Sequence, residues 1–307
     1  MHSGKNWIGG IEAGGSKFHC AVASSPESIV AQTTIDTSTP ADTLARVIAF
    51  FRRFSEAKGG LSALGIASFG PIELSKASPQ YGHILDTPKP AWRGVDIAGE
   101  LERELNVPIG LDTDVNGAAL AEQQFGAGRN CSNFAYVTVG TGIGAGCIVD
   151  DKILYGRSHP EVGHMLIPHD RAKDSFAGCC PFHGDCLEGL ASGVAIEQRW
   201  GVSGAELADD SPAWNLVAEY LATMCVNMER LYASQRILIG GGVMQRTLLY
   251  GLVRQEFLRL MGGYRSVGAD NIDSFIVAPA LGMDAGLIGA LLLAAEQRPA
   301  EKSTQTR

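Results

Sequence analysis

The chain has 307 residues, of which 45% are hydrophobic and 19% charged, and its net charge is −8 at pH 7. This apolar content excludes a disordered chain, because folding can bury enough surface to offset the lost conformational entropy. The chain has 33 acidic and 25 basic residues, and this acidic excess argues against broad binding to nucleic acid or to anionic membranes. A phosphate ligand is still compatible with this charge, because it needs only a local pocket of N–H donors and a metal ion.

The apolar residues are not gathered into a membrane-spanning segment. The longest nearly continuous apolar stretch, 286–295, is about half as long as the roughly 20 residues that a bilayer requires. No apolar run follows the charge near the first residue, so we expect no signal peptide. We therefore expect a cytoplasmic protein whose seven cysteines do not form a disulfide framework.

Apolar periodicity predicts alternating strands and helices in the first half of the chain. Strands are expected at 7–11, 18–23, 28–34, 64–68 and 109–113, and helices at 96–105 and 116–125. A further helix should open at Ser38-Thr-Pro40 and end at Gly59-Gly60, which supply a capping hydroxyl and a stop signal. The segment 71–92 has no clear period, and such long irregular segments are often functional.

The second half repeats this opening theme. A strand at 134–139, a glycine-rich turn at 140–144 and a strand at 145–149 precede a helix at 212–232, a strand at 236–239 and a closing helix at 284–297. The repetition predicts two similar α/β halves. We expect a small domain at 1–115 joined by the closing helix, a larger domain at 116–283, and a disordered polar tail at 298–307.

Three glycine-rich turns follow predicted strands and are candidate phosphate sites. Glycine lets the backbone approach an anion, and successive N–H groups can hold phosphate oxygens. Each turn alone is more simply a tight turn, but three of them at strand ends indicate a bound nucleotide. The candidates are Gly14, Gly15, Ser16 and Lys17; Gly140, Thr141 and Gly142; and Gly240, Gly241 and Gly242. Glu12, at the end of the first strand, is a candidate to organise a magnesium ion through water.

The segment Asp112-Thr-Asp-Val-Asn116 stands at the end of another predicted strand. A carboxylate there can accept a proton from a substrate hydroxyl, while a neighbouring amide fixes the direction of that hydroxyl. The alternative is a helix N-cap, for which Asp and Asn are favoured. The residues alone leave Asp114 open to either role.

Two cysteines and two histidines have the spacing of a metal site. Cys180, His183 and Cys186 are three residues apart, and His164 lies sixteen residues before Cys180. Two thiolates and two imidazoles are a tetrahedral zinc set, and a set with no open position is structural. The segment 168–178 has few apolar residues, so a metal is expected to help order it.

Other residues compete for this metal or surround it. His159, His169 and Cys179 are alternative ligands, and the simpler alternative is buried free cysteine beside surface histidine. Glu161 and Glu188 bracket the cluster in sequence. A zinc ion would therefore bring two carboxylates to one place, where they could hold sugar hydroxyls.

These motifs together resemble the ROK family of sugar kinases, and the resemblance covers nearly the whole chain. Ile11-Glu-Ala-Gly-Gly-Ser-Lys17 resembles the first phosphate motif of the family, and Thr113-Asp-Val-Asn116 resembles its N-D-x-N motif. Glu161-Val-Gly-His164 matches E-x-G-H. The zinc segment, C-x-C-G-x-x-G-C-x-E in the family, is shortened here, and His183 takes the place of the middle cysteine.

The resemblance implies the actin-like ATPase (ribonuclease H-like) fold, an α/β architecture with two similar domains around a cleft. It implies ATP, Mg²⁺ and Zn²⁺ as cofactors, with Asp114 as the catalytic base. The sugar-binding residues that it implies are Thr113, Asn116, Glu161, His164, Glu188 and Gly70. Two departures from the family pattern are Glu12 in place of Asp and Thr113 in place of Asn.

The shortened zinc segment, Ser68-Phe-Gly-Pro71 and Thr87-Pro-Lys-Pro-Ala-Trp92 look most like the bacterial ROK fructokinases. We therefore expect a homodimeric kinase that uses ATP to convert D-fructose to fructose 6-phosphate. A glucokinase, mannokinase or N-acetylmannosamine kinase is the alternative within the family. A sugar-binding regulator is the alternative from another class, but the first motif begins by Gly9 and leaves no room before it for a DNA-binding domain.

Overall fold

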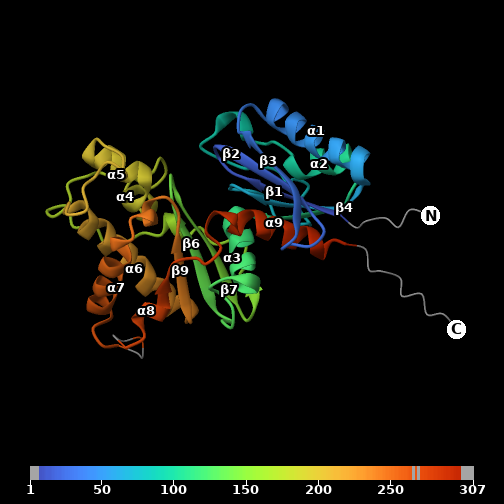
Figure 1. Cartoon of the computed structure of the whole chain (residues 1–307). Helices are drawn as coiled ribbons and strands as arrows, with labels where there is room; N and C mark the ends of the chain where they lie inside the picture. The colour runs from blue at the N-terminus through green and yellow to red at the C-terminus, as the bar shows by residue number, and fades with distance from the viewer. Residues whose placement is uncertain (1–6, 265–266, 268–269, 299–307) are drawn as a thin grey trace. The chain divides into compact units, whose positions relative to one another are not determined.

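The computed structural model describes residues 7–264, 267 and 270–298 (Figure 1). It divides the chain into two units, one comprising 1–121 and 283–307 and the other 122–282. The first division falls after residue 121, inside helix α3 (Asp114–Phe125), and the boundary expected after residue 115 falls inside the same helix. Of the predicted tail, only Arg298 lies within the described residues, and its guanidinium donates to the Ser24 carbonyl at 2.9 Å.

The first unit is built on a five-stranded mixed sheet, which confirms the five strands predicted for this half. The strand order is β3-β2-β1-β4-β5. Strand β1 is antiparallel to β2 and parallel to β4, while β3 is antiparallel to β2 and β5 is parallel to β4. The strands are β1 (Trp7–Ala13), β2 (Lys17–Ala23), β3 (Ile29–Asp36), β4 (Leu61–Ser68) and β5 (Ile109–Thr113).

Helices cover both faces of this sheet (Figure 1). On one face lie α1 (Pro40–Lys58) and α2 (Ile97–Leu105), whose buried residues share one apolar core with the sheet. On the other face lies α9 (Ala285–Glu296), the predicted closing helix. The predicted start of α1 is confirmed, since the Thr39 hydroxyl accepts the Asp42 N–H at 3.4 Å, and the helix ends at Gly59.

A row of three glycines lets α9 lie directly against the sheet. Gly10, Gly65 and Gly110 are register neighbours on β1, β4 and β5. A Cβ atom placed on Gly65 would lie 1.8 Å from the Ala290 carbonyl oxygen, and one on Gly110 would lie 2.3 Å from that of Leu293. A side chain at Gly65 or Gly110 would therefore displace the helix backbone, whereas one at Gly10 would first meet the Leu291 side chain at 2.9 Å.

The second unit repeats the topology of the first. Its strand order is β10-β9-β6-β7-β8, and β6 is antiparallel to β7 and parallel to β9, as β1 is to β2 and β4. The predicted similarity of the two halves is thus confirmed at the level of the sheets. The strands are β6 (Phe134–Val139), β7 (Ile143–Val149), β8 (Lys152–Ile153), β9 (Arg236–Gly240) and β10 (Ile276–Val277).

The core of the second unit lies between its sheet and the helices α6 (Ala213–Tyr232) and α7 (Leu248–Met261). The predicted helix at 212–232 is confirmed as α6. Two short helices that the sequence analysis missed, α4 (Leu187–Ala191) and α5 (Gly193–Trp200), join this core. The remaining short elements are α8 (Ile272–Phe275) and the 3₁₀ turns η1 (Pro90–Trp92), η2 (Val162–His164), η3 (Val243–Gln245) and η4 (Gly282–Asp284).

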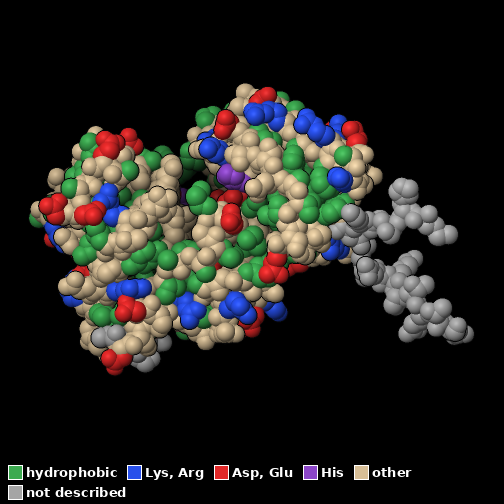
Figure 2. All heavy atoms as spheres, viewed as in Figure 1, with side chains coloured by type: hydrophobic (Ala, Val, Ile, Leu, Met, Phe, Trp, Pro, Cys, Tyr) green, Lys and Arg blue, Asp and Glu red, His purple; other side chains and the backbone are tan. Residues whose placement is uncertain are grey.

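The helices and the charged surface residues match what the sequence led us to expect of apolar stretches and charge. No helix in the described ranges combines the length and the apolarity that crossing a bilayer would take. The apolar stretch 286–295 instead forms most of α9, where Leu291 is fully buried. Basic and acidic side chains are interspersed on the face drawn in Figure 2, so neither sign of charge dominates that face.

Candidate active site

The carboxyl ends of three parallel strands bring the candidate residues of the first unit to one sheet edge. The register places Ala13 of β1 beside Ser68 of β4, and Ser68 beside Thr113 of β5. Glu12, Gly70 and Asp114 each lie within two residues of these positions. Ligands of open α/β sheets bind outside the carboxyl ends of the strands, so this edge is the expected place for a site.

The first phosphate turn joins β1 to β2 and is held by its own backbone. The Gly14 N–H donates to the Lys17 carbonyl at 2.9 Å, and a Cβ on Gly14 would lie 2.7 Å from that oxygen. Thr37 supports the turn, because its hydroxyl donates to the Gly14 carbonyl and its N–H to the Ser16 carbonyl, each at 2.9 Å. The exposed Ser16 and Lys17 side chains thus extend from a fixed backbone.

A second basic residue lies beside this turn. A Cβ placed on Gly15 would lie 2.9 Å from Cε and 3.7 Å from Nζ of Lys89. Lys89 belongs to the irregular segment 71–92, which the sequence indicated as functional without identifying a residue in it. The turn therefore has two ammonium groups, those of Lys17 and Lys89, available for an anion.

Glu12 lies in an environment that favours its neutral form. Burial, together with the negative charges of Asp114 and Asp284, raises the pKa of Glu12 to about 7. A Cβ on Gly286 would lie 2.2 Å from Glu12 Oε1, so the start of α9 leaves space for this carboxylate. A cation would relieve the repulsion among the three carboxylates, and oxygen ligands of this kind suit Mg²⁺. Asp284 was missed by the sequence analysis, which treated it only as the start of a helix.

Asp114 begins helix α3, and its neighbours perform the capping role. The Thr113 hydroxyl accepts the Asn116 N–H at 3.1 Å. Asp112 Oδ1 accepts both the Asn116 side-chain amide and the Thr113 N–H at 2.7 Å. Thr113 and Asn116 are 3% and 0% exposed, and both take part in the start of the helix, while Asn116 Oδ1 has no hydrogen-bond partner among the described residues. Asp114 itself is half-buried, and its Oδ1 accepts the Val115 N–H at 2.9 Å.

The other two glycine turns lie side by side in the second unit. Thr138 of β6 pairs with Gly240 of β9 in a parallel register, so both strands end at one edge. Gly241 has φ of +92°, and a Cβ there would lie 2.5 Å from the Val139 carbonyl oxygen, which requires glycine. Gly142 and Gly240 leave room for side chains, because a Cβ on Gly142 would lie 2.5 Å from the Glu188 carboxylate and one on Gly240 would lie 2.8 Å from the Pro279 ring.

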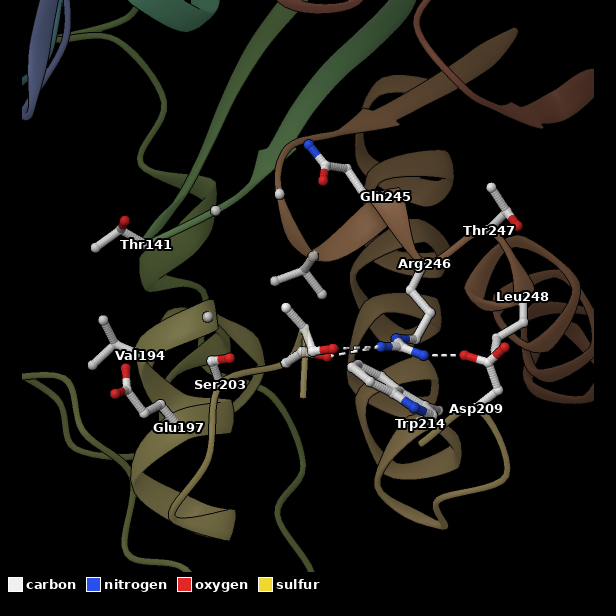
Figure 3. Close-up of a pocket in the computed structure, with 16 residues that line it drawn as sticks. Thr141, Val194, Glu197, Ser203, Asp209, Trp214, Gln245, Arg246, Thr247 and Leu248 are labelled. Atoms are coloured by element: carbon white, nitrogen blue, oxygen red, sulfur yellow. Dashed lines mark hydrogen bonds and ion pairs between the residues drawn. The ribbon is translucent and has the colours of Figure 1, made fainter. Parts of the chain in front are cut away.

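A cavity of about 720 Å³ opens beside these turns (Figure 3). Its size falls within the range of small-molecule sites. Of the predicted phosphate residues, Gly140, Thr141 and Gly242 line it. The cavity is therefore the strongest candidate for the nucleotide site among the residues described.

One wall of the cavity is fixed by an arginine that the sequence analysis missed. The guanidinium of Arg246 stacks on the Trp214 ring, 4.7 Å from its centroid, and pairs with the Asp209 carboxylate (Figure 3). It also donates to the Gly204 carbonyl at 3.0 Å. These contacts hold the 203–209 segment against the start of α7. A sequence pattern gives no sign of them because they join separate loops.

The two glutamates predicted to hold sugar are supported differently. Glu188, in the first turn of α4, accepts the backbone N–H of Ile143 at 2.9 Å, and a Cβ on Gly142 would lie 2.5 Å from the same carboxylate oxygen. Glu161 is 47% exposed at its side chain, and its carboxylate contacts Nε2 of His159 at 2.9 Å. The Glu188 carboxylate is therefore hydrogen-bonded to the second phosphate turn, whereas the Glu161 carboxylate contacts only a histidine two residues before it, among the contacts described.

Four donor atoms converge as predicted for zinc. They belong to His164, Cys180, His183 and Cys186, and all lie within 4.8 Å of one another. His164 Nδ1 is 3.7 Å from both sulfurs, and His183 Nδ1 is 3.7 Å from Cys180 Sγ. Tetrahedral zinc with Zn–S of about 2.3 Å and Zn–N of about 2.0–2.1 Å separates N from S by about 3.6 Å. The geometry and the donor set therefore fit a zinc ion.

The competing ligands lie outside this group. Within the described part of the chain, neither His159 nor Cys179 belongs to the converging set. Both ring nitrogens of His169 have other partners, namely the Asp185 carboxylate at 3.0 Å and the Asp174 carbonyl at 2.9 Å. The four residues predicted first are thus the ones that the fold brings together.

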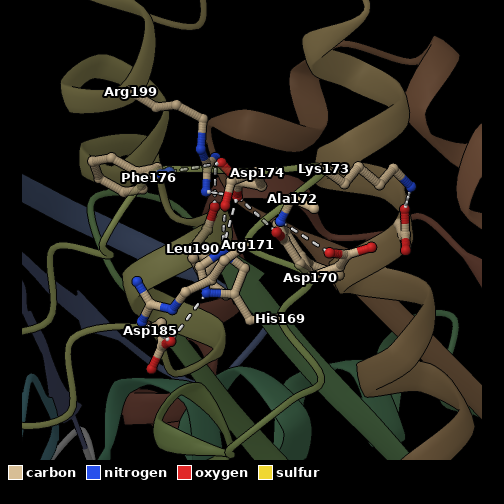
Figure 4. A network of polar contacts seen from close by, with 12 residues as sticks. His169, Asp170, Arg171, Ala172, Lys173, Asp174, Phe176, Asp185, Leu190 and Arg199 are labelled. Atoms are coloured by element: carbon tan, nitrogen blue, oxygen red, sulfur yellow. Dashed lines mark hydrogen bonds and ion pairs between the residues drawn. The ribbon is translucent and has the colours of Figure 1, made fainter.

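The segment 168–178 has a polar anchor that the sequence analysis missed (Figure 4). Asp174 is 5% exposed, and its carboxylate accepts from Arg199 at 3.0 Å and from the Tyr220 hydroxyl at 2.7 Å. Arg199 in turn donates to the Leu190 carbonyl at 2.8 Å. This network fastens the segment to α4, α5 and α6 independently of any metal.

Comparison with known proteins agrees with these features. The model of the ROK family matches residues 8–297. The chain is 41% identical to a fructokinase of Zymomonas mobilis, over 97% of this chain and 100% of that protein. It is 39% identical to a fructokinase of Pediococcus pentosaceus, over 94% of this chain and 97% of that protein.

A solved structure has the same fold as this chain. The crystal structure of a ROK family glucokinase from Streptomyces griseus, in complex with glucose and AMPPNP, superposes with a TM-score of 0.72. It is 24% identical and covers 94% of this chain and 99% of that one. This likeness and the two sheets of equal topology confirm the predicted actin-like ATPase fold. The chain therefore belongs to the ROK family.

Proposed function

We propose that this protein is an ATP-dependent fructokinase, which transfers the γ-phosphate of ATP to the primary hydroxyl of D-fructose and releases fructose 6-phosphate. The observation that carries this proposal is the match, over nearly the full length, to fructokinases that are 41% and 39% identical. The residues described above supply the groups that such a transfer needs: a carboxylate base, phosphate turns and a carboxylate cluster suited to Mg²⁺.

Asp114 is proposed as the catalytic base. Because Thr113 already caps the helix, the Asp114 carboxylate is not needed for that purpose. It would accept the proton of the attacking hydroxyl while the new O–P bond forms. The bond between the γ-phosphorus and the bridging oxygen of ATP would break, with ADP as the leaving group. Phosphoryl transfer depends mainly on positioning and on neutralising charge, so the base works together with the groups that hold the phosphates.

The phosphate groups are assigned to the glycine turns. Gly140, Thr141 and Gly242 line the cavity, and the Thr141 hydroxyl and the Gly242 N–H can donate to phosphate oxygens, whereas the Gly140 N–H already donates to the Gly142 carbonyl at 2.9 Å. The turn at 14–17, with Ser16 and Lys17, is assigned to the transferred phosphate, and Lys89 adds charge there. Mg²⁺, when bound, would neutralise developing phosphate charge, and Glu12 with Asp284 would hold it through water.

The sugar is assigned to Glu161, His164, Glu188 and Gly70. Glu161 is exposed enough to accept hydrogen bonds from sugar hydroxyls. For Thr113 and Asn116, which are buried, we propose a positioning role as well: they would position Asp114 through the start of α3. Asn116 Oδ1, which has no hydrogen-bond partner among the described residues, is proposed to accept from a sugar hydroxyl.

We also propose a structural zinc ion on His164, Cys180, His183 and Cys186, with all four positions filled. Zinc would supply folding free energy to this segment. We further propose that the protein forms a homodimer, as the family resemblance implies. We also propose that it is cytoplasmic.

A coupled assay of ADP release tests the sugar that is used. It should compare kcat/KM for fructose, glucose, mannose and N-acetylmannosamine at saturating ATP and Mg²⁺. We expect fructose to exceed each of the others by at least about 10-fold, the scale of one net hydrogen bond. A clear lead of glucose would favour a glucokinase, and sugar binding without turnover would favour a sugar-binding regulator.

A further inference from the structure

We propose that Glu188 is a positioning residue for the phosphate turn at 140–144, in addition to its assigned contact with the sugar. The zinc-binding segment would then set the shape of the nucleotide site as well as that of the sugar site. This inference rests on the proposed function, because it names how two parts of the same site depend on each other.

The first observation is the hydrogen bond between Glu188 and the turn. Its carboxylate accepts the Ile143 N–H at 2.9 Å, and Ile143 is 5% exposed. A hydrogen bond to an ionised acceptor is stronger than a neutral one, and a buried N–H that loses its acceptor is costly. The absence of a Cβ at Gly142 provides the space that this carboxylate occupies. The turn is therefore shaped around Glu188.

Two further contacts hold the same turn at both of its ends. The Gly193 N–H, at the start of α5, donates to the Gly140 carbonyl at 2.7 Å. At the other end, a Cβ on Gly163 would lie 2.0 Å from the Ile143 carbonyl oxygen, so η2 packs directly on the turn. Together with Glu188, these contacts bring three short helices, η2, α4 and α5, against the five residues of the turn.

These segments also carry the metal ligands. His164 is the last residue of η2, and Cys186 immediately precedes α4, in which Glu188 is the second residue. The Leu187 N–H donates to the Met165 carbonyl at 2.9 Å, which joins the two segments by backbone. Metal ligands, Glu188 and the phosphate turn are thus connected through short, direct contacts.

Glu161 provides a matched control for this inference. It is assigned to the sugar like Glu188, but its carboxylate contacts His159, and it is exposed rather than held against the turn. A change at Glu161 should therefore weaken the sugar site alone. A change at Glu188 should weaken both sites.

The test measures nucleotide binding without sugar, so that the sugar contact of Glu188 cannot contribute. Titration calorimetry with AMPPNP and Mg²⁺ would compare the wild type with Glu188→Ala, Glu188→Gln and Glu161→Ala. Glu188→Ala should weaken binding by about 10-fold, as loss of one charge-assisted hydrogen bond predicts. Glu188→Gln keeps an oxygen acceptor for Ile143 and should stay within about 3-fold of wild type. Glu161→Ala should leave nucleotide affinity unchanged.

Amide hydrogen exchange of Ile143 gives a second readout that needs no ligand. Exchange should be faster in Glu188→Ala than in wild type, and little changed in Glu188→Gln and Glu161→Ala. Glu188→Asp, which keeps the charge but shortens the side chain, replaces Glu188→Ala if the latter loses zinc or does not fold. It should show the same two effects.

Unchanged nucleotide affinity and unchanged Ile143 exchange in the Ala or Asp variant would overturn the inference. A wild-type chain that binds no nucleotide would instead overturn the proposed function. Ile143 exchange would still decide whether Glu188 shapes the turn, so the two failures can be told apart.

Discussion

The Thr113 hydroxyl accepts the Asn116 N–H at 3.1 Å and so caps the helix that Asp114 begins. Asp112 reinforces the arrangement by accepting the Asn116 side-chain amide at 2.7 Å. Asp112 and Thr113 before Asp114, and Asn116 after it, therefore fix the backbone that carries it. This explains how a carboxylate at the end of β5 can have a defined direction without having to serve as the cap.

Replacing Asp114 by Asn should remove the base and keep its shape. Because general base catalysis contributes roughly 10²–10⁴-fold, kcat should fall by about that factor. Steady-state kinetics with fructose and ATP would measure it, and calorimetry with AMPPNP should show nucleotide binding close to that of wild type. A variant that keeps most of its kcat would remove Asp114 from the base role.

The raised pKa of Glu12 predicts how stability depends on pH in the absence of metal. Its pKa is about 7 in the folded protein against an ordinary value of 4.5, so between these pH values the folded state holds a proton that the unfolded state has lost. Stability should therefore fall as pH rises through this window, by up to about 3 kcal/mol from this group.

Glu12→Gln should flatten this dependence. Urea unfolding in EDTA at about pH 5 and about pH 8 would compare the two proteins, and the variant should gain stability relative to wild type at the higher pH. Mg²⁺ added at the higher pH should stabilise the wild type more than the variant. If the free energy of unfolding changed equally with pH in the two proteins, the raised pKa could not belong to Glu12.

In the glycine row under α9, replacing a glycine by alanine should lower the free energy of unfolding much more than the same change elsewhere. Gly65→Ala would place a Cβ 1.8 Å from the Ala290 carbonyl oxygen, so the helix must move and the free energy of unfolding should fall by at least about 1–3 kcal/mol. Gly251→Ala is the matched control, because Gly251 lies in α7 with open space around it. The control should be neutral or slightly stabilising in urea unfolding, since Ala favours a helix. Equal effects of the two changes would show that α9 does not rest on this row.

One zinc ion per chain is expected from the four converging ligands. Elemental analysis of the purified protein should find about one zinc, and Cys186→Ser should lose it and lower thermal stability. The KM for fructose should rise at the same time, because Cys186 lies directly before the helix of Glu188. A fully active and stable protein without zinc would leave these residues as buried cysteine beside histidine.

Periodicity and turn chemistry were sufficient to predict the long elements. Strands β1 to β7 and β9 and helices α1, α2, α3, α6 and α9 were all predicted from alternating or helical patterns. The start of α1 followed from a capping side chain and that of α2 from apolar spacing, whereas α3 begins at Asp114 rather than Asn116 because Thr113 provides the cap. The short helices α4 and α5 were missed because elements of 5 and 8 residues carry too few turns to show a period.

The functional residues were predictable only where a local motif contained them. The zinc ligands lie close enough in sequence to show their spacing, and the fold brings all four together. Lys89, Asp284 and Arg246 were missed because each reaches its place through a fold contact with a distant segment. The hydrogen bond from the Asn116 amide to Asp112 at 2.7 Å was not predicted either, although both residues lie in the segment that the sequence singled out.

The central claim is that this chain phosphorylates fructose at its primary hydroxyl. The most direct measurement is nuclear magnetic resonance of the products formed by the purified protein from fructose, ATP and Mg²⁺. We expect fructose 6-phosphate and ADP in equal amounts, with no ADP formed when fructose is omitted. Phosphate on a different hydroxyl, or ADP formed without any sugar phosphate, would contradict it.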